Sequence, residues 1–210
     1  MWKTEERNKE TMRTAKTKVY KFNELSDDAK VVALDWGRYS DPFFNGWSEF
    51  IIDDFHERMM GIGINIEKGT IDWNTESPGS TDFEATVSTA KILKNKYPNW
   101  AIADPLKLLV DAEEEGVMET RYKDQYLDID LNYDELAIAM KPHVELCLQR
   151  NTIGAEGFLR KMIEDMIEDF RLELGKRLKD EYEYMGTDEY VTEELLANEY
   201  EFTKEGNKWN

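Results

Sequence analysis

The sequence predicts an α+β protein, in which a mostly antiparallel sheet of about five or six strands packs against amphipathic helices, with one long C-terminal helix. Short runs of alternating apolar and polar residues, bounded by turn residues, are typical of strands. Longer runs place an apolar residue at every third or fourth position, which is typical of helices with one buried face. The 210 residues, 40% of them hydrophobic, suffice to bury a core without disulfides.

The N-terminal part predicts one strand and two helices. Residues 18–22 alternate in the manner of a short strand, and Ser26 is a suitable N-cap because its hydroxyl can accept a backbone N–H. The apolar face of the helix that follows is expected to consist of Ala29, Val32, Ala33 and Trp36. A second helix is expected over 47–60, ended by Gly61. Its apolar stripe is expected to consist of Trp47, Phe50, Ile51, Phe55 and Met59.

The middle of the chain predicts further strands. Two runs, 62–67 and 70–73, are expected to form a hairpin around Lys68-Gly69. A loop follows, and residues 82–93 have strand character through their apolar alternation. These three segments would add neighbouring strands to one antiparallel sheet.

A helix and a second hairpin are expected next. Asp104-Pro105 indicates a helix start, with an N-cap followed by proline at the first position, and Gly116 indicates its end. The inward residues expected on this helix are Leu106, Leu109 and Val110. The alternating runs 117–123 and 126–132 flank Asp124-Gln125 and predict a hairpin.

The C-terminal part is mainly helical in pattern. Residues 134–150 have a helical composition but contain Pro142, which leaves their structure open. A long helix is expected over 155–185, and Thr187 is expected to cap a last short helix. Residues 200–203 predict an extended segment. The stripe expected along the long helix consists of Phe158, Met162, Met166, Phe170, Leu174 and Leu178.

The chain carries a net charge of −18, and most of it lies in the C-terminal half. Residues 1–100 contain 14 basic and 17 acidic side chains, whereas residues 101–210 contain 13 and 28. This balance disfavours contact with nucleic-acid phosphates or anionic lipid, so neither nucleic acid nor a membrane is an expected partner. Two interpretations stay open: the acidic surface keeps the protein dissolved, or it attracts a basic groove on another protein.

Compartment and domain organisation follow from what the chain lacks. No apolar run approaches the roughly 20 residues of a membrane-spanning helix, and residues 1–18 have no signal-peptide segment, so we expect a cytoplasmic protein. The single cysteine, Cys147, allows no internal disulfide, and its leucine neighbours predict a buried thiol. Residues 1–17 are expected to form a flexible lead-in, and residues 18–210 a single α+β domain.

Carboxylates are concentrated on the predicted long helix, which is the candidate partner-binding surface. A row at four-residue spacing, such as Glu164 with Glu168, can imitate the charges of a nucleic-acid strand, whose phosphates lie about 3.4 Å apart along the axis. The alternative is an acidic helix face that is simply solvated. The candidate residues are Glu164, Asp165, Glu168, Asp169, Glu173, Asp180, Glu181 and Glu183.

No residue pattern indicates a catalytic, cofactor or metal site, so no cofactor is expected. His56 lies among carboxylates but lacks a second ligand at the spacing of a helical zinc site, and His143 has no recognisable partner. The acidic helix also lacks the Glu-x-x-His motif of di-iron bundles. The Ser77–Thr81 loop leads into a strand, which is typical of a turn and not of a phosphate-binding loop.

Three motifs mark the chain: Tyr20-x-Phe-x-Glu-Leu-Ser26, Glu181-Tyr-Glu-Tyr184 and Asn198-x-Tyr-x-Phe-Thr-x-x-Gly206. In this order, across residues 18–206, they resemble a family of small, mostly uncharacterised accessory proteins encoded by bacteriophages and prophages. The loop around 77–83 departs from the Gly-Asp-Gly pattern of that family, so the resemblance carries no ligand-binding role over to it. It implies a phage-encoded protein of the host bacterial cytoplasm that disarms a host nuclease or defence system, and it supplies no catalytic residues.

Three functions stay open, in descending order of preference. The first is an inhibitor whose acidic half docks on a basic, nucleic-acid-binding surface of a host defence protein. The second is a nucleotide or small-ligand sponge, with a pocket walled by Trp36, Trp47 and Trp73. The third is a metal-dependent hydrolase that uses scattered carboxylates. The long helix offers a surface for pairing with a second copy, so a homodimer is an open alternative.

Overall fold

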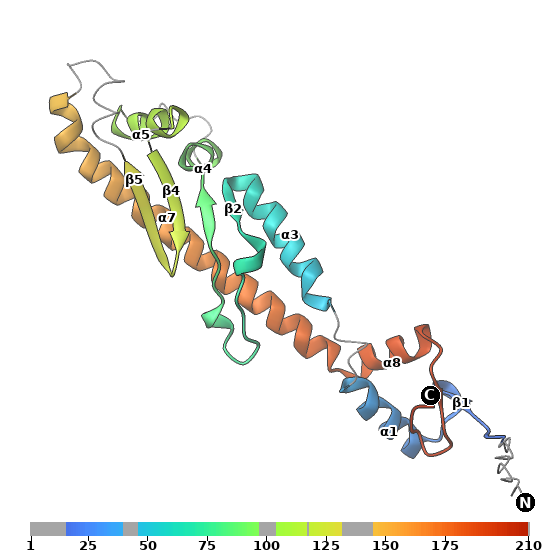
Figure 1. The fold of residues 1–210 in the computed structure, drawn as a ribbon. Helices are drawn as coiled ribbons and strands as arrows, with labels where there is room; N and C mark the ends of the chain where they lie inside the picture. Colours follow the sequence, from blue (N-terminus) through green and yellow to red (C-terminus); the bar gives the residue numbers. More distant parts are fainter. Residues whose placement is uncertain (1–15, 40–45, 97–103, 117, 132–144, 210) are drawn as a thin grey trace, which may run out of the picture. The chain divides into compact units, whose positions relative to one another are not determined.

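The computed structural model describes residues 16–39, 46–96, 104–116, 118–131 and 145–209 (Figure 1). Within them it shows the predicted α+β fold, with six α-helices and two antiparallel sheets. The contacts between residues divide the chain into two compact units. Unit 1 combines both ends of the chain, 1–43 and 185–210, and unit 2 is the continuous stretch 44–184. A single domain over 18–210 stays a prediction.

Unit 1 joins the N-terminal and C-terminal motifs of the sequence in one small sheet. Tyr20 pairs with Phe202, and Lys21 pairs with Glu201, in antiparallel register. The elements are β1 (Tyr20–Lys21), the 3₁₀ helix η1 (Phe22–Glu24), α1 (Asp27–Arg38), α8 (Asp188–Ala197) and β6 (Glu201–Phe202). Both predicted helix N-caps are confirmed: the Ser26 hydroxyl accepts the Ala29 N–H, and the Thr187 hydroxyl accepts the Tyr190 N–H.

The core of unit 1 lies between α1, α8 and β6. Phe202 and Leu195 are fully buried, and the Trp36 ring contacts Phe202 edge-on at 6.0 Å between centroids. The prediction that Val32 faces the core is wrong, because it is 40% exposed; Ala29 and Ala33 form the buried face. Because alanine has a small side chain, the neighbouring backbone can approach α1 closely. The buried face of α1 is therefore formed by small residues and not by its largest apolar residues.

Unit 2 has a four-stranded sheet in the order β2-β3-β4-β5, and every pairing in it is antiparallel. Its elements, besides the short 3₁₀ turns η2 (Lys68–Thr70) and η3 (Pro78–Ser80), are α3 (Trp47–Ile62), β2 (Ile64–Ile66), β3 (Ala85–Val87), α4 (Thr89–Lys96), α5 (Asp104–Glu114), β4 (Met118–Lys123), β5 (Tyr126–Leu131) and α7 (Glu145–Met185).

The hairpin predicted around Lys68-Gly69 is wrong. The segment turns as η2, and neither residue has the positive φ that a tight two-residue hairpin requires. β2 pairs instead with β3, with Ile64 opposite Val87. The predicted strand over 82–93 is also too long: β3 ends at Val87, and the chain continues as α4, whose first turn is capped from elsewhere by the Glu113 carboxylate accepting the Ala90 N–H at 3.0 Å.

The second predicted hairpin is confirmed. β4 and β5 pair with Lys123 opposite Tyr126, and the two turn residues Asp124 and Gln125 both have positive φ. Such a turn matches the right-handed twist of the strands it connects. The predicted position of α5 is confirmed, although Asp104, predicted as its N-cap, is its first helical residue; Gly116, at φ 74°, lies two positions beyond its last residue, Glu114.

α3 ends two residues later than predicted. Gly63, not Gly61, terminates it in the left-handed region at φ 106°, where glycine is favoured. The predicted stripe also included Phe50, which is wrong, because this side chain is 80% exposed. The buried stripe is Ile51, Phe55 and Met59, spaced by four residues.

α7 has 41 residues, which corresponds to roughly 60 Å at 1.5 Å per residue. Its end at Met185 is confirmed, and it begins ten residues before the predicted start, within the segment left open; residues 134–144 lie outside the described part. Phe158 is 49% exposed, so its place in the predicted stripe is wrong. The side chains that are buried deepest on α7 are Leu159, Ile163, Ile167, Leu174, Leu178 and Met185.

One hydrophobic core fills unit 2 between α3, α4, α5, α7 and one face of the sheet (Figure 1). The strands alternate strictly, so that Met118, Thr120 and Tyr122 are buried while Glu119 and Arg121 are exposed. The opposite face of the sheet is therefore open in the part of the chain that the structure describes. No helix among the described residues is long and apolar enough to cross a membrane.

Candidate functional site

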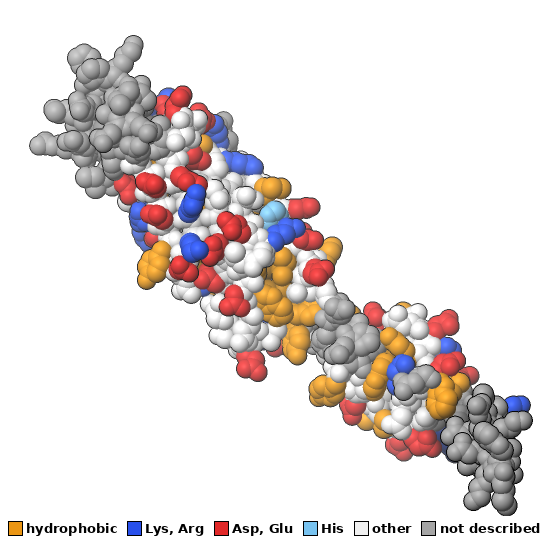
Figure 2. Space-filling view, in the orientation of Figure 1, with side chains coloured by type: hydrophobic (Ala, Val, Ile, Leu, Met, Phe, Trp, Pro, Cys, Tyr) orange, Lys and Arg blue, Asp and Glu red, His pale blue; other side chains and the backbone are white. Residues whose placement is uncertain are grey.

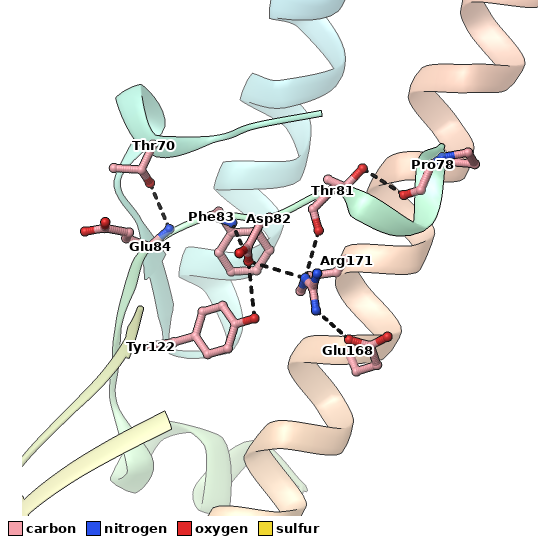
Figure 3. A network of polar contacts seen from close by, with 9 residues as sticks. All are labelled: Thr70, Pro78, Thr81, Asp82, Phe83, Glu84, Tyr122, Glu168 and Arg171. Atoms are coloured by element: carbon pink, nitrogen blue, oxygen red, sulfur yellow. Dashed lines mark hydrogen bonds and ion pairs between the residues drawn. The ribbon is translucent and has the colours of Figure 1, made fainter. Parts of the chain in front are cut away.

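A polar network on the core side of unit 2 ties the Ser77–Thr81 loop to α7 (Figure 3). Arg171 is 8% exposed, and its Nε donates to the Thr81 carbonyl oxygen at 2.8 Å. The same guanidinium lies 3.4 Å from the Asp82 carboxylate and 2.7 Å from the Glu168 carboxylate. These partners satisfy a charge that would otherwise be costly to bury.

Tyr122 joins this network from β4. Its hydroxyl donates to Asp82 Oδ1 at 3.3 Å, and its ring lies 5.6 Å from that of Phe83. Burial raises the pKa of Tyr122 to about 12, against the lowering effect of Arg171 and with a further rise from Asp82. The phenol therefore stays protonated throughout the physiological pH range and acts as a hydrogen-bond donor.

The loop itself packs directly on α7. Gly175 is buried, and a Cβ at this position would clash with the Pro78 carbonyl oxygen and lie 2.6 Å from Thr81 Oγ1. Thr81 is fully buried, and its hydroxyl donates to the Pro78 carbonyl at 2.9 Å. The loop forms the turn η3, as predicted. Its contacts hold the loop against α7.

The predicted carboxylates of α7 all remain accessible, but they do not form an uninterrupted acidic row. Asp165 lies 3.1 Å from Lys161, Glu168 binds Arg171, and Glu183 lies 3.6 Å from Lys179. The lysines occupy the same solvent side of the helix and break the row that the sequence suggested. Glu164, Asp169 and Asp180 are exposed.

Two of the predicted α7 carboxylates are partly covered by neighbouring side chains. Glu173 is half-buried, and its carboxylate lies 2.6 Å from Arg58 of α3. Glu181 is also half-buried, close to the Trp47 end of α3, where Tyr182 contacts the Trp47 ring at 5.9 Å. Glu173 therefore contributes to helix packing, which lowers its availability for a partner.

A second acidic surface, which the sequence did not single out, covers the open face of the sheet. One row crosses all four strands, from Asn65 through Thr86 and Arg121 to Asp128. Glu119 and Asp130 face each other in the next row. The side chains that form this surface, called the open sheet face, are Asn65, Glu67, Glu84, Thr86, Glu119, Arg121, Lys123, Tyr126, Asp128 and Asp130.

Carboxylates outnumber cationic groups on the open sheet face by five to two. Figure 2 shows this excess of red over blue above β4 and β5. The hydrogen bond and charge of Glu119 raise the pKa of Arg121, with smaller contributions from Glu67 and Asp128. Glu84 raises the pKa of Lys123 in the same way. Each cation thus lies in the field of more than one carboxylate, and the surface stays negative at neutral pH.

The alternation of charged residues in 118–123 and 126–131 was a usable signal for half of the open sheet face. Glu119, Arg121 and Lys123 occupy every second position of β4, and Asp128 and Asp130 do so on β5. The contribution of Glu67 could not be found in this way, because it depends on the pairing of β2 with β3.

The three tryptophans of the predicted ligand pocket belong to two different units. Trp47 contacts Trp73 edge-on at 5.2 Å in unit 2, whereas Trp36 contacts Tyr200 at 5.2 Å in unit 1. A groove of about 450 Å³ lies beside α7, with Phe158, Met162 and Met166 among its lining residues. In the described part of the chain no three His, Cys, Asp or Glu residues are grouped to hold a metal ion. His143 and the Cys147 side chain lie outside that part.

The comparisons with known proteins give no match. No family model, no curated protein and no solved structure is similar to this chain. The resemblance of its three motifs to phage accessory proteins therefore stays a prediction. The first and last motifs pair in one sheet, where Tyr20 lies opposite Phe202.

Proposed function

We propose that this chain is an acidic binding protein that docks on the basic surface of a nucleic-acid-processing or defence protein of a bacterial host and inhibits it. The observation that carries the proposal is the accessible surplus of carboxylates on unit 2. Six of the eight predicted α7 carboxylates are exposed and the other two are half-buried, and the open sheet face adds five more carboxylates. With a net charge of −18, the molecule would attract a basic surface from a distance.

The phage origin rests on the motifs at the two ends of the chain. They lie in unit 1, where Phe202 is fully buried and Gly206 packs against the Ala29 carbonyl at φ 88°, so they are explained by folding. The partner-binding role belongs to unit 2 in this proposal. The third motif, at 181–184, lies on α7 in unit 2, so that part of the resemblance overlaps the proposed inhibitory surface.

Capture from a bacterial lysate tests the proposal. The immobilised protein should retain basic, nucleic-acid-binding proteins at about 0.05 M salt and release them at about 0.5 M, because exposed charges are screened beyond a Debye length of roughly 10 Å at 0.1 M. Adding the free protein to a captured partner should abolish that partner's binding to labelled DNA or RNA. Retained proteins that are not basic, or a partner that still binds nucleic acid, would contradict the proposal.

A further inference from the structure

We infer that the principal docking surface for a basic partner is the open sheet face and not the solvent side of α7. This inference rests on the proposed function and names the surface that performs it. The open sheet face has no element over it among the described residues, and its five carboxylates face the same way. The occupant is a lysine- and arginine-rich protein surface.

Charge density distinguishes the two acidic surfaces. Strands lie about 4.8 Å apart, so four strands place the open sheet face within a width of about 14 Å. On α7, the acidic residues from Glu164 to Glu183 extend over about 28 Å at 1.5 Å per residue, Lys176 and Lys179 are interspersed with them, and Lys161 precedes them by one turn. The compact surface presents its net negative charge within little more than one Debye length, so a basic patch would meet all of it together.

The open sheet face also presents its carboxylates from a fixed backbone. The carboxylates of β4 and β5 project from strands that are paired over six residues, from Met118 opposite Leu131 to Lys123 opposite Tyr126. Their backbone is fixed before binding, so less conformational entropy is lost on association. Tyr126, 77% exposed at the hairpin end, adds an aromatic face on which an arginine guanidinium can stack.

Charge complementarity selects the occupant. A second copy of this chain carries the same −18 and would meet the open sheet face with like charge. Arg121 and Lys123 do not neutralise the surface, because Glu119 at 2.8 Å and Glu84 at 3.0 Å already pair with them, which leaves Glu67, Asp128 and Asp130 for the partner. A surface built to bind nucleic-acid phosphates has the complementary charge.

The test uses full-length protein and a fluorescein-labelled ten-residue arginine peptide as the probe, with fluorescence anisotropy at low salt. Three triple variants change the net charge equally. They are Glu67→Lys/Asp128→Lys/Asp130→Lys on the sheet, Glu164→Lys/Asp169→Lys/Asp180→Lys on α7, and Glu57→Lys/Glu193→Lys/Glu205→Lys as the matched control. We expect the sheet variant to weaken binding at least tenfold, and the other two variants to weaken it less than threefold.

Backbone amide shifts of the wild-type protein locate the probe independently. Shifts concentrated on β4 and β5 are expected; shifts concentrated on α7, or a tenfold loss with the α7 variant alone, would overturn the inference while leaving the proposed function intact. If the wild-type protein does not bind the probe, the proposed function fails as well. Should the lysine variant not fold, Glu67→Gln/Asp128→Asn/Asp130→Asn replaces it with the same expected direction.

Discussion

Close packing at single residues decides how the Ser77–Thr81 loop is held. Gly175 has no side chain, which lets the Pro78 carbonyl and the Thr81 hydroxyl approach the backbone of α7. Gly157, on the same helix, has nothing within 4 Å of the place where a Cβ would lie. Two glycines that look alike in the sequence therefore have opposite consequences.

Substituting these two glycines separates packing from helix propensity. Gly175→Ala should lower the free energy of unfolding by about 1–2 kcal/mol, because the clash outweighs the gain of roughly 1 kcal/mol that alanine brings to a helix. Gly157→Ala, the control, should raise it by about 0.5–1 kcal/mol. Urea unfolding measures both. A stabilising Gly175→Ala would show that the loop does not press against α7.

We predict that the folded protein loses stability at high pH as Tyr122 ionises. Its pKa is raised to about 12 in the folded protein, above the ordinary value of 10, so its contribution is complete below about pH 10 and is lost as pH rises toward 12. A shift of two pKa units corresponds to about 2–3 kcal/mol. Unfolding measured by circular dichroism across this range should show the fall in the wild-type protein and a smaller fall in Tyr122→Phe. Equal falls in both proteins would place the effect elsewhere.

At the scale of elements, local signals predicted several helix starts and the tight hairpin well. Ser26 and Thr187 cap their helices with their own hydroxyls, and Asp124-Gln125 turns with positive φ at both residues. Each of these features depends on a few neighbouring residues and one hydrogen-bond pattern. They are therefore visible in a short stretch of sequence.

Elements that depend on distant partners were predicted less well. β2 is only three residues long, and it is a strand because it pairs with β3. The segment that follows β2 in the chain therefore does not pair with it as a hairpin. The alternation of Phe83, Ala85 and Val87 predicts a strand, but this pattern stops at Val87, and α4 begins at Thr89. Its first turn is satisfied by Glu113, which is distant in the sequence, and no local pattern reports such a cap.

At the scale of the molecule, unit 2 should fold by itself. It is continuous in the chain and contains the whole of the main hydrophobic core. A fragment of residues 44–184 should unfold cooperatively in urea and protect its strand amides from hydrogen exchange. The control fragment 44–160 lacks Ile163, Ile167, Leu174 and Leu178 and should not fold. A fragment 44–184 without cooperative unfolding would instead favour a single domain over 18–210.

The sequence by itself determined the α+β class, the acidic surplus and the starts of α1, α3, α5 and α8, because composition and short-range hydrogen bonding decide them. The tertiary structure alone decided which acidic residues share a surface. Glu173 is drawn to Arg58 of α3, while Glu67 and Asp128 come to one face only because four strands pair in a particular order. The physical reason is that side-chain neighbours across a sheet or between helices are set by register and packing, which residues distant in the chain establish together.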